Sequence, residues 1–171
     1  MELVFPSSWD LNVHAMAGCE APGLTSEQIR SKLEQPIGTE PLSKLARGKK
    51  NALIMVDDLC RPTKAYEILP HVLGQLNEAN LSDNQIRMIV GVGTHAPLTI
   101  DQIRKKIGKE TLERVEVYNH NPYENTVNVG KTSGGTEVWI NKEVMECDFK
   151  IAISSIVAHA GAGWEGGAKM I

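Results

Sequence analysis

The sequence predicts an α/β domain with a largely parallel, Rossmann-like sheet, helices on both faces and a small hairpin. The run Ala52–Val56 is apolar at every position and is bounded by lysines and aspartates, which is typical of a strand buried on both faces of a parallel sheet. Strand-like and helix-like segments then alternate along the chain. Helices interleaved with strands favour a parallel sheet.

The first part of the chain is expected to hold a strand, a turn-rich segment and a helix. Residues 1–24 are interpreted as a strand followed by turns, because prolines, glycines and serines interrupt them. A helix should begin after Thr25, since Gln28 completes a capping box, and it should end at Pro36.

The middle of the chain predicts two strand–helix units. After the strand at 52–56, Pro62 favours a helix start, and apolar residues at helical spacing continue to Ala79. Pro70 within this segment predicts a kink or a restart. A strand at 86–90 follows, and a second capping box at 99–102 opens a helix to about residue 107.

The last part should contain a strand at 115–118, a hairpin and a final strand at 149–154. Gly134 and Gly135 are expected to form the turn of a hairpin, and the alternating segment 137–140 is expected to be the strand after that turn. Residues 141–146 suit a short helix. The 171 residues are enough for one domain with its own core.

The composition argues against several partners. A formal net charge of −3 gives no electrostatic reason to bind nucleic acid or an anionic membrane. The N-terminus lacks a basic segment followed by an apolar one, and no apolar run approaches the roughly 20 residues of a membrane helix. We therefore expect a cytoplasmic protein.

Cysteine usage points to a reducing compartment. Cys19, Cys60 and Cys147 are odd in number and lack the CxxC spacing of a zinc or redox site. Cys19 and Cys147 are interpreted as reduced thiols in the core or in loops. Cys60 lies in a segment rich in reactive side chains, and its role stays open.

Reactive side chains gather where three predicted strands end. The segments are DDLCRPT at 57–63, GVGTH at 91–95 and SSIVAHAGAGWEGGAK at 154–169. In an open parallel sheet the carboxyl ends of the strands face one crevice, where ligands bind. The residues expected to meet in one cleft are Asp58, Arg61, His95, His159 and Lys169.

Each of these side chains also has a simpler interpretation. Asp58 could simply cap the end of a strand and have no other role, and Arg61 could be a surface charge. His95 could satisfy a backbone carbonyl, although the glycines beside it would let backbone approach a ligand. Among the other histidines, His71 is interpreted as structural and His120 as a minor candidate.

The glycine-rich stretch near the C-terminus could be a ligand-binding loop or a flexible linker. Gly161, Gly163, Gly166 and Gly167 lose much backbone entropy on ordering, and their exposed amides could cradle an anionic group. A flexible linker is the alternative, but linkers favour serine and lack an embedded tryptophan such as Trp164.

Three motifs in this order resemble the nickel-pincer lactate racemase family: D-D-x-x-R-P-T, G-x-G-T-H and H-x-x-x-G-x-x-G-G-x-K. The resemblance covers essentially the whole chain. It implies that residues 1–171 form the N-terminal α/β domain of a two-domain enzyme, whose active site lies between the domains. The C-terminal domain is then expected beyond Ile171.

The resemblance also implies a cofactor and two catalytic bases. The cofactor is nickel pyridinium-3,5-bisthiocarboxylic acid mononucleotide, the nickel-pincer nucleotide, tethered to a lysine that matches Lys169. The two histidines that act as acid and base match His95 and His159.

Other positions of the motifs match the lining of the family's active site. Asp58, Gly166 and Gly167 are expected to line the cofactor. Arg61 is expected to pair with the carboxylate of the substrate, because a planar guanidinium suits bidentate recognition.

The implied reaction is racemisation or epimerisation of a 2-hydroxy acid by proton-coupled hydride transfer. Removing hydride while a base takes the hydroxyl proton avoids a carbanion, and a cofactor must hold the hydride. The planar keto acid can take hydride back on either face, so two imidazoles serve both enantiomers.

The chain departs from the family pattern in three ways. Glu165 stands where a serine is expected, and it adds a negative charge beside an anionic cofactor. Asn121 follows His120 where an aspartate is commoner. The nickel-binding histidine is expected beyond Ile171, so this chain is expected to supply no metal ligand and to be inactive when isolated.

The residues leave two other functions open. One is a metal-dependent hydrolase with Asp58, His95 and His159 as ligands. The other is a non-catalytic module that binds phosphate-bearing small molecules through the glycine loop and Lys169. The sequence identifies neither the particular hydroxy acid nor the oligomeric state.

Overall fold

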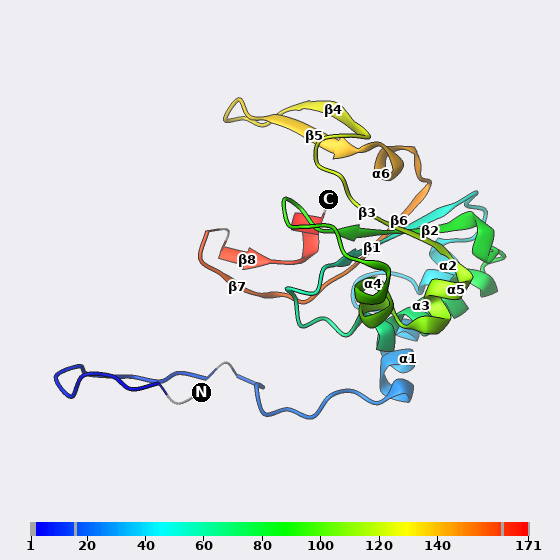
Figure 1. Cartoon of the computed structure of the whole chain (residues 1–171). Coiled ribbons are helices and arrows are strands. Elements are labelled where there is room, and N and C mark those ends of the chain that lie inside the picture. The colour runs from blue at the N-terminus through cyan, green and yellow to red at the C-terminus, as the bar shows by residue number, and fades with distance from the viewer. Residues whose placement is uncertain (1–2, 16, 162, 171) are drawn as a thin grey trace.

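A four-stranded parallel sheet organises the chain (Figure 1). The structure is a computed structural model that describes residues 3–15, 17–161 and 163–170, apart from the side chains of 168 and 169. The strand order is β3-β2-β1-β6 and all three pairings are parallel. The strands are β1 (Ala52–Asp57), β2 (Ile86–Gly91), β3 (Glu116–Asn119) and β6 (Phe149–Ile153).

The larger helices cover one face of this sheet. Ile54, Val56 and Met88 from the strands are fully buried against Leu69 and Leu73 of the longest helix. β1 is buried at every position, which confirms the prediction made from its unbroken apolar run. The helices on this side are α1 (Ser26–Glu34), α2 (Leu42–Leu45), α3 (Ala65–Glu78), α4 (Ile100–Ile107) and α5 (Lys109–Arg114).

Smaller elements cover the opposite face. Leu53, Met55 and Ile89 pack there with Val144 and Met170. An antiparallel hairpin formed by β4 and β5 precedes α6 on this side (Figure 1). The elements are β4 (Thr126–Lys131), β5 (Glu137–Asn141), α6 (Lys142–Glu146) and the 3₁₀ turn η2 (Gly167–Met170). The predicted α/β class, with helices on both faces and a small hairpin, is confirmed.

Two predicted helix starts are correct and a third is displaced. Thr25 and Thr99 cap α1 and α4, and the capping box predicted at each is formed. The third helix begins at Ala65 rather than next to Pro62, and it runs through Pro70 without a restart. The buried apolar side of α3 offsets the backbone hydrogen bond that a proline cannot donate.

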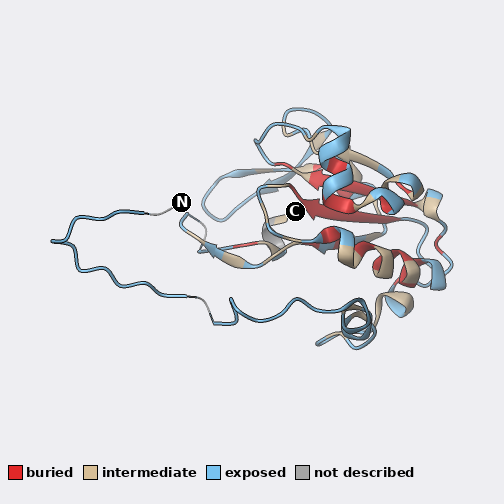
Figure 2. Ribbon diagram, turned by 60° about the horizontal axis from the view of Figure 1, so that its bottom comes forward, coloured by how far each residue is buried: buried red, intermediate tan, exposed pale blue. Residues whose placement is uncertain are grey.

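The strand predicted near the N-terminus is wrong. Residues 3–15 and 17–24 contain turns and bends but no strand, and their side chains are exposed. Val4 and Val13 are 90% and 95% exposed. Figure 2 shows this segment extending away from the body of the domain, where no strand of the described chain pairs with it.

The strand order creates a crevice beside β1. The chain passes from β1 to β2 and β3 on one side, and later returns to the other side of β1 through β6. Such a reversal of strand order opens a space at the carboxyl ends of the strands. After β6 the glycine-rich stretch forms an unpredicted hairpin of β7 (Val157–His159) and β8 (Gly163–Glu165).

A short 3₁₀ turn, η1 (Asp83–Gln85), precedes β2. In the part of the chain that the structure describes, no helix has the length and apolarity to cross a membrane.

Candidate active site

A cleft of about 460 Å³ lies at the carboxyl ends of the central strands. Asp58, Arg61, His95 and His159 all line it, as the sequence predicted from the strand ends. The side chain of Lys169 lies outside the described residues, but its neighbour Met170 lines the same cleft. The segments that follow β1, β2 and β6 therefore bring residues far apart in sequence to one place.

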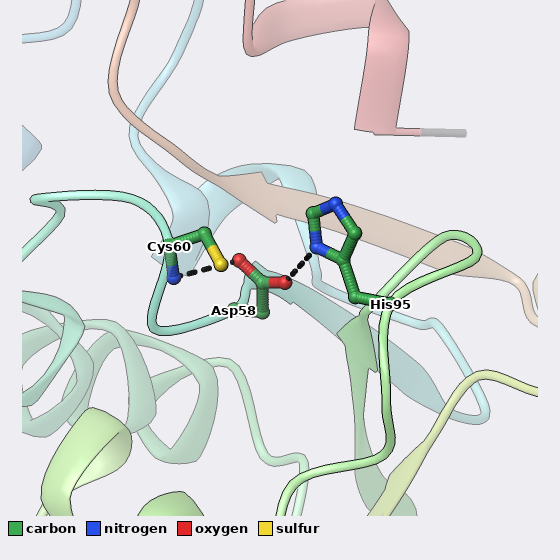
Figure 3. A group of neighbouring side chains, drawn as sticks. All are labelled: Asp58, Cys60 and His95. Atoms are coloured by element: carbon green, nitrogen blue, oxygen red, sulfur yellow. Dashed lines mark hydrogen bonds and ion pairs between the residues drawn. The ribbon is translucent and has the colours of Figure 1, made fainter.

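Asp58 holds the ring of His95. The Asp58 carboxylate and Nδ1 of His95 lie 2.5 Å apart (Figure 3). The same carboxylate accepts a hydrogen bond from the backbone N–H of Cys60 at 3.0 Å, which fixes its orientation. Because a carboxylate accepts, the contact favours the proton on Nδ1 and leaves Nε2 of His95 as a free base.

Asp57 anchors the loops around the cleft. Its carboxylate lies 2.6 Å from the ammonium of Lys106, and both side chains are almost fully buried. It also accepts the hydroxyl of Thr63 at 2.5 Å, and that hydroxyl in turn accepts the backbone N–H of Ser155 at 2.7 Å. Lys106 further donates to the carbonyl of Arg61 at 3.2 Å. One buried ion pair thus joins the ends of β1 and β6 to α4.

Arg61 already has a carboxylate partner within the chain. Its guanidinium lies 2.9 Å from the carboxylate of Glu165, whose side chain is 8% exposed. Glu165 departs from the family pattern, and no feature of the sequence predicts its pairing with Arg61. The contact depends on the β7–β8 hairpin, which the glycine spacing alone did not predict.

Gly166 is required by the close approach of two backbones. It has a φ of +82°, and a Cβ there would lie 2.2 Å from the carbonyl oxygen of Ser155. Gly167 follows, and its N–H donates to the hydroxyl of Ser154 at 3.2 Å. Gly166 lines the cleft, and the glycine-rich stretch is an ordered hairpin and turn rather than a linker.

His159 projects from β7 into the same cleft as His95. Its Nδ1 accepts the backbone N–H of Gly161 at 3.1 Å, which orients the ring across the hairpin turn. The ring is half-buried. The two imidazoles predicted as acid and base are therefore on the walls of one cleft.

His120 and Asn141 also line the cleft. Sequence patterns indicated His120 as a minor candidate and did not indicate Asn141 as a site residue. The amide of Asn141 donates to Nδ1 of His120 at 3.1 Å. Burial lowers the pKa of His120 below its ordinary value, since the charged ring would lose water. Asn141 ends β5, and only the packing of the β4–β5 hairpin over the sheet brings it to the site.

Cys60 completes a group of potential metal ligands. Ligand atoms of Asp58, Cys60 and His95 all lie within 4.8 Å of one another (Figure 3). Among the described residues this is the group of three that could hold an ion, and it does not include His159.

Comparison with known proteins identifies relatives along the whole chain. The family model described as the lactate racemase N-terminal domain matches residues 1–171. The lactate racemase of Thermoanaerobacterium thermosaccharolyticum is 32% identical over 162 residues, which cover 93% of this chain and 38% of that protein. The lactate racemase of Lactiplantibacillus plantarum is 33% identical over 147 residues, which cover 85% of this chain and 34% of that protein.

The fold is similar as well. The apoprotein structure of the T. thermosaccharolyticum lactate racemase matches with a TM-score of 0.77 and 32% identity, covering 83% of this chain and 34% of that one. The chain therefore spans between 34% and 38% of the length of these curated relatives.

Proposed function

The chain belongs to the lactate racemase N-terminal domain family, and on that premise we propose that it is the catalytic and cofactor-tethering domain of a 2-hydroxy-acid racemase or epimerase. The observation that carries the proposal is the cleft in which His95, His159 and Arg61 come together. Two bases and a guanidinium suit a substrate that has both a hydroxyl and a carboxylate.

His95 and His159 exchange the hydroxyl proton of the substrate. In one direction an imidazole takes the proton as hydride leaves Cα, which gives a planar 2-keto acid. Nε2 is the accepting nitrogen on His95, whereas Nδ1 of His159 must first release the Gly161 N–H before that ring can take a proton at Nε2. The other imidazole returns a proton when hydride comes back to the opposite face. Asp58 supports this role of His95, because its carboxylate keeps the ring proton on Nδ1.

Arg61 binds the carboxylate of the substrate through its guanidinium. Glu165 competes for the same group, since it now lies 2.9 Å away. The substrate carboxylate either displaces Glu165 or shares the guanidinium with it. Glu165 therefore sets how tightly a simple hydroxy acid binds.

The lining of the cleft fits the nickel-pincer nucleotide. A volume of about 460 Å³ lies in the range of small-molecule sites. Gly91, Gly93 and Gly166 give it walls without side chains, so a flat ring can approach the backbone. Asp57 and Glu165 pair with Lys106 and Arg61, which limits repulsion of an anionic ligand from these two carboxylates, while Asp58 pairs with His95.

Lys169 would tether this nucleotide, while Asp58, Gly166 and Gly167 would line it. When bound, the nucleotide supplies an acceptor and donor of hydride. The chain's own contribution is the proton chemistry of the two imidazoles and the orientation of the substrate by Arg61. We propose that a C-terminal domain closes the site, and that the protein works in the cytoplasm.

Covalent loading and isotope retention test the proposal in the full-length, cofactor-loaded protein. Lys169→Ala should abolish the added mass seen by intact mass spectrometry, while His95→Gln and His159→Gln should keep it. Lactate deuterated at C2 and racemised in ordinary water should retain its deuterium, because hydride does not exchange with solvent. Loss of the deuterium, or unchanged loading of Lys169→Ala, would overturn the proposal.

The same experiment separates the alternatives left open by the sequence. The hydrolase interpretation requires Asp58, His95 and His159 to bind one ion. The group whose ligand atoms lie within 4.8 Å of one another consists instead of Asp58, Cys60 and His95. A non-catalytic phosphate-binding module would not interconvert the enantiomers of any hydroxy acid, with or without the cofactor.

A further inference from the structure

We propose that Asp58, Cys60 and His95 form a binding site for a divalent d-block cation such as Zn²⁺, which shares Asp58 and His95 with the cleft. Their oxygen, sulfur and nitrogen atoms lie within 4.8 Å of one another. Asp58 is buried, whereas Cys60 and His95 are exposed. Both of these exposed residues lie on loops (Figure 3). The proposed racemase chemistry uses no thiol, which leaves Cys60 unexplained by it.

The charges in the cleft favour a cation at this position. Three carboxylates line the cleft, those of Asp57, Asp58 and Glu165. Lys106 pairs with Asp57 at 2.6 Å and Arg61 pairs with Glu165 at 2.9 Å. No lysine or arginine of the described chain pairs with Asp58, which is 4% exposed and has only His95 as an ionisable partner. A buried carboxylate without a permanent counter-charge is costly, and a bound cation removes that cost.

The donor types select the class of metal. Imidazole nitrogen and thiolate sulfur suit Zn²⁺, Co²⁺ or Ni²⁺, whereas Mg²⁺ and Ca²⁺ require oxygen ligands. Three protein ligands and one open position match a four-coordinate zinc site. Zinc binds nitrogen and oxygen at about 2.1 Å and sulfur at about 2.3 Å, so His95 and Asp58 must separate by about 1 Å to admit the ion.

Binding changes the proton on His95. The Cys60 thiol releases one proton to solvent and binds as thiolate. His95 binds through Nδ1, the nitrogen that faces Asp58, so its proton moves to Nε2. The ring can then no longer accept a proton at Nε2. Inhibition of racemisation follows from this step and rests on the proposed role of His95, but the binding itself does not.

Cobalt provides the test, because a thiolate ligand gives Co²⁺ a charge-transfer absorption in the near ultraviolet. We expect the reduced full chain, without cofactor or substrate, to bind one equivalent of Co²⁺ with this absorption and to lose it on adding Zn²⁺. Cys60→Ser should remove the absorption and weaken Co²⁺ binding at least about tenfold. Thermal melting followed by circular dichroism checks that the variant is folded.

Two matched variants identify the ligands. Cys19→Ser alters another exposed cysteine and should keep the absorption. His159→Gln should also keep it, which separates this site from a hydrolase centre built on His159. A spectrum that survives Cys60→Ser, or that disappears with Cys19→Ser, would overturn the site. Because neither substrate nor cofactor is present, failure of the racemase proposal would leave this result unchanged.

Discussion

The guanidinium of Arg61 and the carboxylate of Glu165 lie 2.9 Å apart inside the cleft, and the glutamate is almost fully buried. Glu165 thus pairs with the guanidinium that is proposed to bind the carboxylate of the substrate. Arg61 comes from the loop after β1 and Glu165 from β8, so the contact ties the glycine-rich hairpin to the centre of the sheet.

Glu165→Gln is expected to improve binding of simple hydroxy acids. Removing the competing charge frees Arg61, and a gain of about 1.4 kcal/mol would lower KM about tenfold with little change in kcat. Steady-state kinetics of the full-length, loaded protein measure this. Glu113→Gln removes an exposed charge on α5 and is the control. A KM for Glu165→Gln that is unchanged or higher contradicts the competition.

Asp58→Asn is expected to lower kcat on the order of 10²-fold or more. An amide can donate to Nδ1, which favours the tautomer with its proton on Nε2 and removes the base. The same kinetic measurement, combined with the mass of the loaded protein, separates lost catalysis from lost cofactor. Asp101→Asn, at an exposed position of α4, should leave kcat as it is. Equal kcat in both variants would disprove the role of Asp58.

Lys106→Met is expected to destabilise the fold by about 3–5 kcal/mol, because it leaves the buried Asp57 carboxylate without its counter-charge. Urea unfolding followed by circular dichroism provides the free energy. Lys105→Met changes the adjacent, exposed lysine and should cost far less. If the double variant Asp57→Asn/Lys106→Met is more stable than Lys106→Met alone, the unpaired Asp57 carboxylate is the cause of the lost stability. Equal losses for Lys105→Met and Lys106→Met would contradict this.

Gly166→Ala should displace the glycine loop, whereas Gly163→Ala should only strain it. Both glycines have a positive φ, which costs an alanine about 1 kcal/mol. Only at Gly166 does the added Cβ also meet a backbone oxygen, at 2.2 Å. Thermal melting should show the larger loss for Gly166→Ala, and covalent cofactor loading should fall with it. Equal melting temperatures would mean that the Ser155 carbonyl moves away freely.

His120 should make the protein less stable in acid. Burial lowers its pKa in the folded state below the ordinary value of about 6.5, so the unfolded chain binds more protons between the two values. Stability therefore falls as the pH drops through the window just below 6.5. Urea unfolding measures this effect. Between about pH 7.5 and about pH 5, the free energy of unfolding of His120→Gln should fall less than that of the wild type. An identical loss would show that His120 is not responsible.

Much of the fold could be predicted from local patterns. The unbroken apolar run of β1 predicted its burial, and the capping boxes at Thr25 and Thr99 predicted two helix starts. The N-terminal strand was predicted wrongly, because a segment forms a strand only when another strand pairs with it, and no described strand pairs with this one. α3 continues through Pro70 because its apolar face is buried, which is a property of packing rather than of propensity.

The sequence by itself determined that the motifs after β1, β2 and β6 converge, because parallel strands direct their carboxyl ends to one edge of the sheet. It therefore predicted the shared cleft of Asp58, Arg61, His95 and His159. Only the tertiary structure decided which of them pair. The contacts of Asp58 with His95, Arg61 with Glu165 and Asp57 with Lys106 join loops or helices far apart in the chain. Such pairs depend on distances of a few ångströms, which the packing of the helices and hairpins on the sheet sets and no local pattern encodes.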